Sequence, residues 1–139
     1  MQPAITNDRL SAMIRTSPFQ RLLNLTVKDT DTVTQTLELV MPFNPDLARL
    51  DGEHQFHGGV IASLIDIAGD CVLVWALGFT VPTINFRTDY LRLAHNTSLT
   101  AKATIRRIGK SIGVVDIEVA DEEDRVVAIG RGSYGTSKG

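Results

Sequence analysis

Apolar and polar residues alternate along several stretches of this chain. In the first third, the apolar positions that recur at about every second residue are Leu23, Leu25, Val27, Val33, Leu37, Leu39 and Met41. A period of two predicts strands with one buried face. We expect two such strands, joined by a turn at residues 28–31.

Four more alternating stretches, rich in Val, Ile and Thr, fill the second half of the chain. They run over Thr83–Leu93, Leu99–Ile108, Ser111–Ala120 and Arg125–Tyr134. The short polar segments at 109–110 and 121–124 are typical of tight turns between antiparallel strands. The pattern therefore predicts four strands in succession.

A different pattern separates the two sets of strands. From Gly58 to Leu77 apolar residues recur at helical spacing, and Gly78 is a natural C-terminal stop. A helix that is apolar on most sides is buried on most sides. Residues 1–20 form an N-terminal helical segment, whose pattern extends from about Asp8 to Asn24 and breaks at Pro18.

This order of elements predicts an α+β fold in a single domain, residues 1–139. Two strands, one apolar helix and four strands in succession differ from the alternating units of a parallel sheet. In a chain this short, a curved sheet is the structure able to surround the helix. We expect an antiparallel β-sheet wrapped around one long central helix at residues 58–77.

Composition and charge narrow the range of functions. The formal net charge of −2 gives no electrostatic reason to expect a nucleic acid or an anionic membrane as a partner. There is no Cys/His metal spacing, and we interpret the single cysteine, Cys71, as a buried inert thiol. The apolar stretches look far shorter than the ~20 residues of a membrane span, and we see no secretion signal. We therefore expect a cytoplasmic protein.

Two carboxylates interrupt the apolar helix. Asp66 and Asp70 lie four residues apart, which places them on one stripe of the helix. A buried, unpaired carboxylate is costly, so it indicates a partner or a function. The alternative is that the stripe faces solvent through a slit in the sheet. Both interpretations are open for Asp66, and we expect Asp70 to be the better candidate for simple exposure.

The start of the helix is the second unusual feature. His57, Gly58 and Gly59 precede the first apolar turn, so free backbone N–H groups point out of the helix N-terminus and a ligand can approach them closely. Such a terminus is suited to a carbonyl oxygen or an oxyanion. Asp66 lies roughly 12 Å further along the same helix. A site shared between two subunits would bring the two together.

The stretch from His57 to Asp66, HGGVIASLID, resembles the signature of hotdog-fold acyl-CoA thioesterases of the PaaI type. The resemblance covers nearly the whole chain, and it includes Ser17-Pro18-Phe19, Asn85 with Tyr90-Leu91-Arg92, and Arg107-Ile108-Gly109-Lys110. It implies a hotdog fold and hydrolysis of a short-chain, medium-chain or aromatic acyl-CoA without a metal or other cofactor. It also implies a homodimer with shared active sites that forms a tetramer.

The resemblance implies roles for single residues. Gly58 matches the residue whose N–H polarises the thioester carbonyl. Asp66 matches the acid that attacks this carbonyl or activates water, acting from the partner subunit. Thr83 falls where a hydroxyl helps to hold the water, although an ordinary strand threonine fits as well. His57 either assists the carbonyl or orients the loop, and a histidine that merely caps the turn is equally compatible.

The coenzyme A moiety also has candidate contacts. Residues that lie near it in similar proteins correspond to Asn85, Tyr90, Arg107, Ile108, Gly109, Lys110 and Ser111. Four cations are candidates for its phosphates, namely Arg92, Arg106, Arg107 and Lys110. Such residues are also common as solvated charges at the edge of a sheet.

One position departs from the family pattern. Similar enzymes have Asn or Gln six residues before the histidine, where it donates to the thioester oxygen, but here the residue is Asp51. An ionised carboxylate only accepts hydrogen bonds. Either His54 or Gln55 replaces the donor, or the loop shifts, or the activity is weak. The departure keeps a non-catalytic acyl-CoA-binding module open as an alternative, and a hotdog hydroxyacyl dehydratase is a more distant one.

Overall fold

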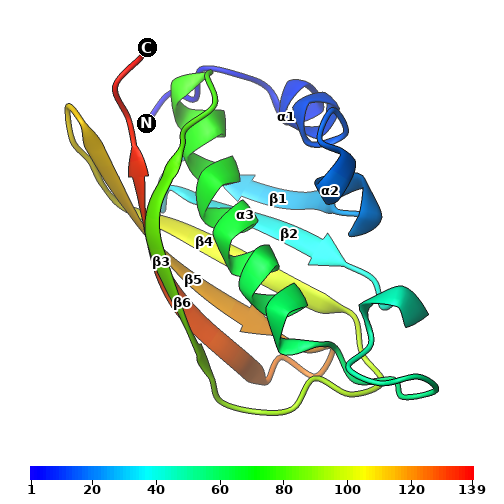
Figure 1. The fold of residues 1–139 in the computed structure, drawn as a ribbon. Coiled ribbons are helices and arrows are strands. Elements are labelled where there is room, and N and C mark those ends of the chain that lie inside the picture. Colours follow the sequence, from blue (N-terminus) through cyan, green and yellow to red (C-terminus); the bar gives the residue numbers. More distant parts are fainter.

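A six-stranded antiparallel sheet dominates the computed structural model, which describes all 139 residues (Figure 1). Its strands are β1 (Thr26–Asp31), β2 (Thr36–Met41), β3 (Thr83–Tyr90), β4 (Leu99–Ile108), β5 (Ile112–Ala120) and β6 (Val126–Gly135). They lie in the order β1-β2-β4-β5-β6-β3, and every neighbouring pair is antiparallel. The strand β3 follows the central helix in sequence and lies beside β6, so it forms one edge of the sheet.

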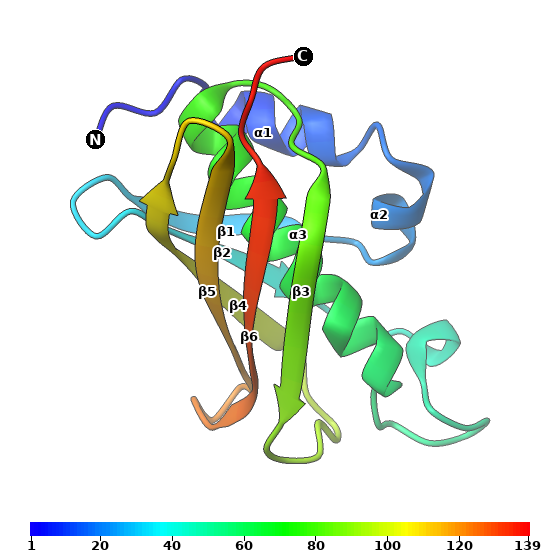
Figure 2. The ribbon, with the colours of Figure 1, turned by 60° about the vertical axis from the view of Figure 1, so that its left-hand side comes forward.

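The long helix α3 (Gly58–Leu77) crosses the concave face of this sheet (Figure 2). Leu64, Ile65, Ala68 and Val72 have no exposed surface, because the sheet curves around them. The helix ends at Gly78, which has a φ of 84° and therefore favours glycine. The α+β architecture and the helix bounds predicted from the sequence are confirmed.

Two short helices precede the sheet, and the first of them packs against α3. These are α1 (Asn7–Ile14) and α2 (Pro18–Leu22), and the side chains of Thr6 and Ser17 cap their N-termini. The break predicted at Pro18 is the start of α2, where proline suits the first helical position. Leu10 and Ile14 bury α1 against the core, and a 3₁₀ turn, η1 (Pro45–Leu47), lies in the loop before α3.

The first hairpin differs from the prediction. Residues 28–31 belong to β1, and the turn lies at residues 32–35, where Gln35 has a positive φ of 58°. The Asp31 carboxylate accepts the N–H groups of Val33 and Thr34, which places the start of the turn four positions later than expected. Val33 is consequently 88% exposed and does not share the buried face of Leu37.

The length of the apolar helix α3 differs from what the sequence led us to expect. The helix has 20 residues and a mean hydropathy of 2.0, so by length and composition it could cross a membrane. Apolar stretches were expected to fall far short of that length. Most of this helix is buried inside the fold, as is usual for the core helix of a wrapped sheet.

Candidate active site

Asp66 lies half-buried on α3, where the helix passes the beginning of β3. The Thr83 hydroxyl donates a hydrogen bond of 2.8 Å to its Oδ1. No hydrogen bond reaches Oδ2. The carboxylate is therefore held on one side and free on the other, which suits a group that must meet a substrate or a water molecule.

Tyr134, on β6, approaches the same residue from beneath the helix. It has no exposed surface, and its hydroxyl donates a hydrogen bond of 2.9 Å to the main-chain carbonyl of Asp66. Burial, with the nearby charges of Asp66 and Asp70, raises the pKa of this phenol. Tyr134 was not predicted from the sequence, because a tyrosine that alternates correctly in a strand gives no signal beyond that of a core residue.

The N-terminus of α3 offers a free donor. The Gly58 N–H donates to no other group, since the first residue of a helix has no acceptor one turn before it. The Gly59 N–H, in contrast, donates to His57 Nδ1 over 2.9 Å. His57 is therefore an N-cap in this structure, one of the three roles considered for it. The Tyr90 hydroxyl donates to the Gly58 carbonyl over 2.5 Å.

A cavity of about 510 Å³ opens in front of this helix start. Its lining is half apolar and includes two arginines; the residues are Arg49, Gln55, Phe56, Gly58, Gly59, Ile61, Tyr90, Leu91, Arg92, Leu93 and Ala94. The volume is in the range typical of sites for small molecules. Asp66 is absent from the lining, because eight residues of helix separate it from Gly58 by roughly 12 Å. One protomer does not bring Asp66 to its own Gly58.

The three candidates for the missing amide donor lie in different places. Gln55 lines the cavity beside Gly58. His54 stacks on Phe43, with 5.3 Å between the ring centroids. Asp51 is exposed in a turn and does not line the cavity. Of the three, only Gln55 lines the same cavity as Gly58.

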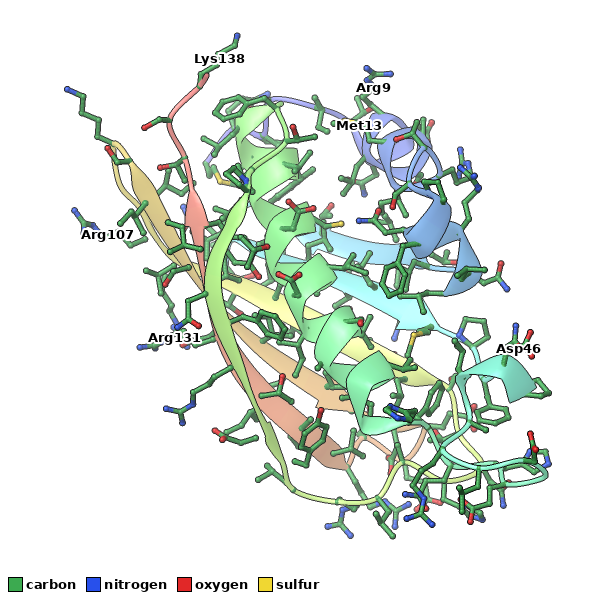
Figure 3. The ribbon with its side chains drawn as sticks, in the orientation of Figure 1. Arg9, Met13, Asp46, Arg107, Arg131 and Lys138 are labelled. Atoms are coloured by element: carbon green, nitrogen blue, oxygen red, sulfur yellow. The ribbon has the colours of Figure 1, made fainter.

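The candidate contacts for coenzyme A fall into two groups. Tyr90 lines the cavity, whereas Asn85 is exposed on the edge strand β3. Residues Arg107 to Ser111 form the hairpin between β4 and β5, where Thr136 Oγ1 donates to the Gly109 carbonyl over 2.7 Å. Arg107 points away from α3 on the outside of the sheet (Figure 3). Within one protomer, this hairpin does not line the cavity at Gly58.

The candidate cations also separate. Arg92 lines the cavity, but Arg106 donates to Asp116 over 2.7 Å on the outer face of the sheet. Arg131, which also points outward in Figure 3, forms a second ion pair with the same carboxylate. Hydrogen bonds from Arg131 and Arg106 lower the pKa of Asp116 to about 2. Arg106 is thus occupied by a structural ion pair, and Arg92 remains the better candidate for a phosphate.

Asp70 is half-buried, so it is less exposed than its position on the helix led us to expect. Its carboxylate lines a cavity of about 130 Å³ beneath α1 and α2. Burial raises its pKa to about 7, the Asp66 charge adds to the rise, and the Val81 N–H opposes it. Cys71 is 2% exposed and burial raises the pKa of its thiol, as expected for an inert cysteine.

Comparison with known proteins identifies the family. The sequence model of the Thioesterase superfamily matches residues 55–128, more than half of the chain. The chain belongs to the thioesterase superfamily. It is therefore an enzyme that hydrolyses thioesters, and its wrapped sheet is the hotdog fold.

Individual relatives support the assignment of this chain to the thioesterase superfamily. An esterase of Halobacterium salinarum is 38% identical over 109 residues, which cover 70% of this chain and 72% of the relative. The medium/long-chain acyl-CoA thioesterase YigI of Escherichia coli is 27% identical over 135 residues, 84% of each chain. The structure of Escherichia coli PaaI, from the phenylacetic acid degradation operon, matches with a TM-score of 0.81 and 26% identity over 95% of this chain and 93% of that one. The PaaI-type resemblance is thereby confirmed.

Proposed function

We propose that this thioesterase hydrolyses acyl-CoA, with Asp66 as the reacting carboxylate and the Gly58 N–H as the donor to the thioester oxygen. The observation that carries the proposal is the Asp66 carboxylate itself. It lies on an otherwise apolar helix, Thr83 holds one of its oxygens, and the other oxygen is free. The names of the relatives YigI and PaaI, both acyl-CoA thioesterases, support the substrate class.

The distance between Gly58 and Asp66 leads us to propose a homodimer. The edge strand β3 carries Thr83 and has an unpaired side along eight residues, and Ile84 on it is 57% exposed. An open edge of this length favours pairing with another strand. Pairing through β3 would set Asp66 next to the other copy and form two shared sites related by a twofold axis. Two such dimers would form the tetramer.

In the proposed reaction, the thioester carbonyl points at the N-terminus of α3 in one protomer. The Gly58 N–H and the helix dipole stabilise negative charge on the oxygen as it develops. Asp66 of the other protomer follows one of two routes. It attacks the carbonyl carbon and expels the coenzyme A thiolate, leaving an anhydride that water cleaves, or it takes a proton from a water molecule that attacks instead.

The cavity supports a bound acyl-CoA. The apolar side chains Ile61, Leu91 and Leu93 provide contacts for a hydrocarbon or ring, and Arg49 and Arg92 at the same cavity offer positive charge for phosphates. A short-chain, medium-chain or aromatic acyl group is our proposal for the substrate. Gln55 lines the same cavity, and we propose that its side-chain amide completes the oxyanion site.

The role of Gly58 has a sharp test. Proline is well accepted at the first position of a helix and lacks only the N–H, so Gly58→Pro removes the donor and keeps the helix. Gly58→Ala is the matched control, because it keeps the N–H and its Cβ would lie 3.4 Å from the Tyr90 hydroxyl, an ordinary contact. Release of free thiol from a panel of acyl-CoA esters measures the rate. We expect kcat/KM to fall by about 10²-fold or more for proline, and far less for alanine. Equal losses in the two variants would argue against the donor role.

A further inference from the structure

Tyr134 and Thr83 face each other across the strand pair β3–β6. They are directly opposite in the register of the two strands, so both side chains project from the same face of the sheet, toward α3. Both hydroxyl groups donate to the same residue, Asp66. Thr83 donates to the Asp66 carboxylate over 2.8 Å, and Tyr134 donates to the Asp66 main-chain carbonyl over 2.9 Å.

Two glycines make room for the Tyr134 ring. A Cβ added at Gly69, in the middle of α3, would lie 2.7 Å from Cζ of the ring. A Cβ added at Gly132, two residues before Tyr134 on β6, would lie 2.6 Å from the same atom. Both distances are too short for real contacts. The place of the Tyr134 ring between β6 and α3 therefore depends on the absence of side chains at these two positions.

Packing alone does not explain the hydroxyl. Phenylalanine would fill the same space, and the Asp66 carbonyl, in the interior of the helix, already accepts the N–H four residues later. A buried hydroxyl is unfavourable unless it donates or accepts a hydrogen bond. The one hydrogen bond that the Tyr134 hydroxyl makes is to Asp66. Because burial and the two nearby carboxylates raise its pKa, this phenol stays protonated and remains a donor.

We propose that Tyr134 is a positioning residue that, together with Thr83, fixes the orientation of Asp66 for catalysis. Tyr134 holds the main chain of Asp66 against the sheet while Thr83 holds Oδ1, so the free oxygen keeps one direction. The inference rests on the proposed function only in taking Asp66 as the reacting group. Gly69 and Gly132 belong to the same arrangement, because they admit the ring.

Tyr134→Phe tests the proposal, since it removes the hydroxyl and keeps the ring. The matched control is Thr36→Val, which removes another buried hydroxyl, on β2, whose one hydrogen bond is to Thr34. We expect Tyr134→Phe to lower kcat tenfold or more with KM within twofold of wild type, and Thr36→Val to change neither. In an Asp66→Asn background, Tyr134→Phe should change the residual rate less than twofold. A kcat for Tyr134→Phe within twofold of the Thr36→Val control would overturn the proposal.

A structural measurement separates this inference from the proposed function. If the wild-type protein hydrolyses no acyl-CoA, the proposed function fails, and crystal structures of the wild type and Tyr134→Phe then decide the positioning role alone. We expect a single Asp66 conformer bonded to Thr83 in the wild type, and a shifted or divided conformer in Tyr134→Phe. The same single conformer in both structures would contradict the positioning role.

Discussion

Asp70 gives this thioesterase a stability that depends on pH. The carboxylate is half-buried beneath α1 and α2, and none of the residues that line its cavity is positively charged. The charged group nearest to it on the helix is Asp66, which repels its negative charge. Burial is the main cause that raises the pKa of Asp70 from 3.8 to about 7 in the folded protein.

The size of this stability change follows from the difference between the pKa of Asp70 in the folded protein and its pKa in the unfolded chain. Each pKa unit corresponds to about 1.4 kcal/mol, so a rise of about 3 units gives at most about 4 kcal/mol. Between pH 4 and pH 7 the folded protein binds the proton and the unfolded chain releases it. The contribution of Asp70 to stability is therefore fully present below pH 4, falls as the pH rises through this window, and is lost above pH 7. Because water partly reaches the group, we expect about 2–4 kcal/mol.

Urea unfolding followed by circular dichroism, at pH 5 and pH 8 and at one protein concentration, measures the effect. Asp70→Asn cannot ionise, so it should lose less stability than the wild type between pH 5 and pH 8. The matched control is Asp124→Asn, which changes an exposed aspartate with a φ of 59° that asparagine also adopts. A pH dependence of Asp70→Asn equal to that of the wild type would refute the reasoning.

Four further substitutions test other contacts. Replacing glycine by alanine in most helix interiors adds about 0.5–1 kcal/mol of stability. Gly69→Ala should instead lower the free energy of unfolding by about 1–3 kcal/mol, because its Cβ meets Tyr134. Urea unfolding shows whether the variant is more or less stable than the wild type. Asp51→Asn should leave kcat/KM unchanged, whereas Gln55→Ala should lower it, since only Gln55 lines the cavity; a rise for Asp51→Asn would mean that position 51 reaches the site. Ile84→Lys puts a charge on the open edge of β3, so sedimentation should show dissociation to monomers with loss of activity; an active monomer would contradict the shared site.

The sequence predicted the parts of the fold that follow from local periodicity. Strands with one buried face, such as β2 with Leu37, Leu39 and Met41, alternate clearly, and α3 is marked by its apolar spacing and by Gly78. The edge strand β1 is polar along much of its length, so its residues 28–31 resembled a turn. Alternation is informative only where one face of a strand is buried.

The site residues could be predicted only where they lie close together in the sequence. His57, Gly58 and Asp66 lie on one helix and its cap, so their pattern indicated a helix start suited to an oxyanion and a carboxylate with either a function or an exposed position; the catalytic role of Asp66 came from the family resemblance. Tyr134 and Gly69 come into contact because β6 packs on α3. A contact between elements so far apart in the sequence cannot be predicted from a local pattern. The burial of Asp70 likewise depends on α1 and α2, which cover the same side of the helix from a distant part of the chain.

The central claim is that each active site combines Gly58 of one protomer with Asp66 of the other. Mixing two inactive variants, Asp66→Ala and Gly58→Pro, tests it directly. After subunit exchange at a one-to-one ratio, half of the dimers contain one chain of each kind, and each of these has one site with both wild-type residues. We predict recovery of about a quarter of the wild-type thioesterase rate, as twofold symmetry requires. Confirmed exchange with no recovery of activity would show that each site is built from a single chain.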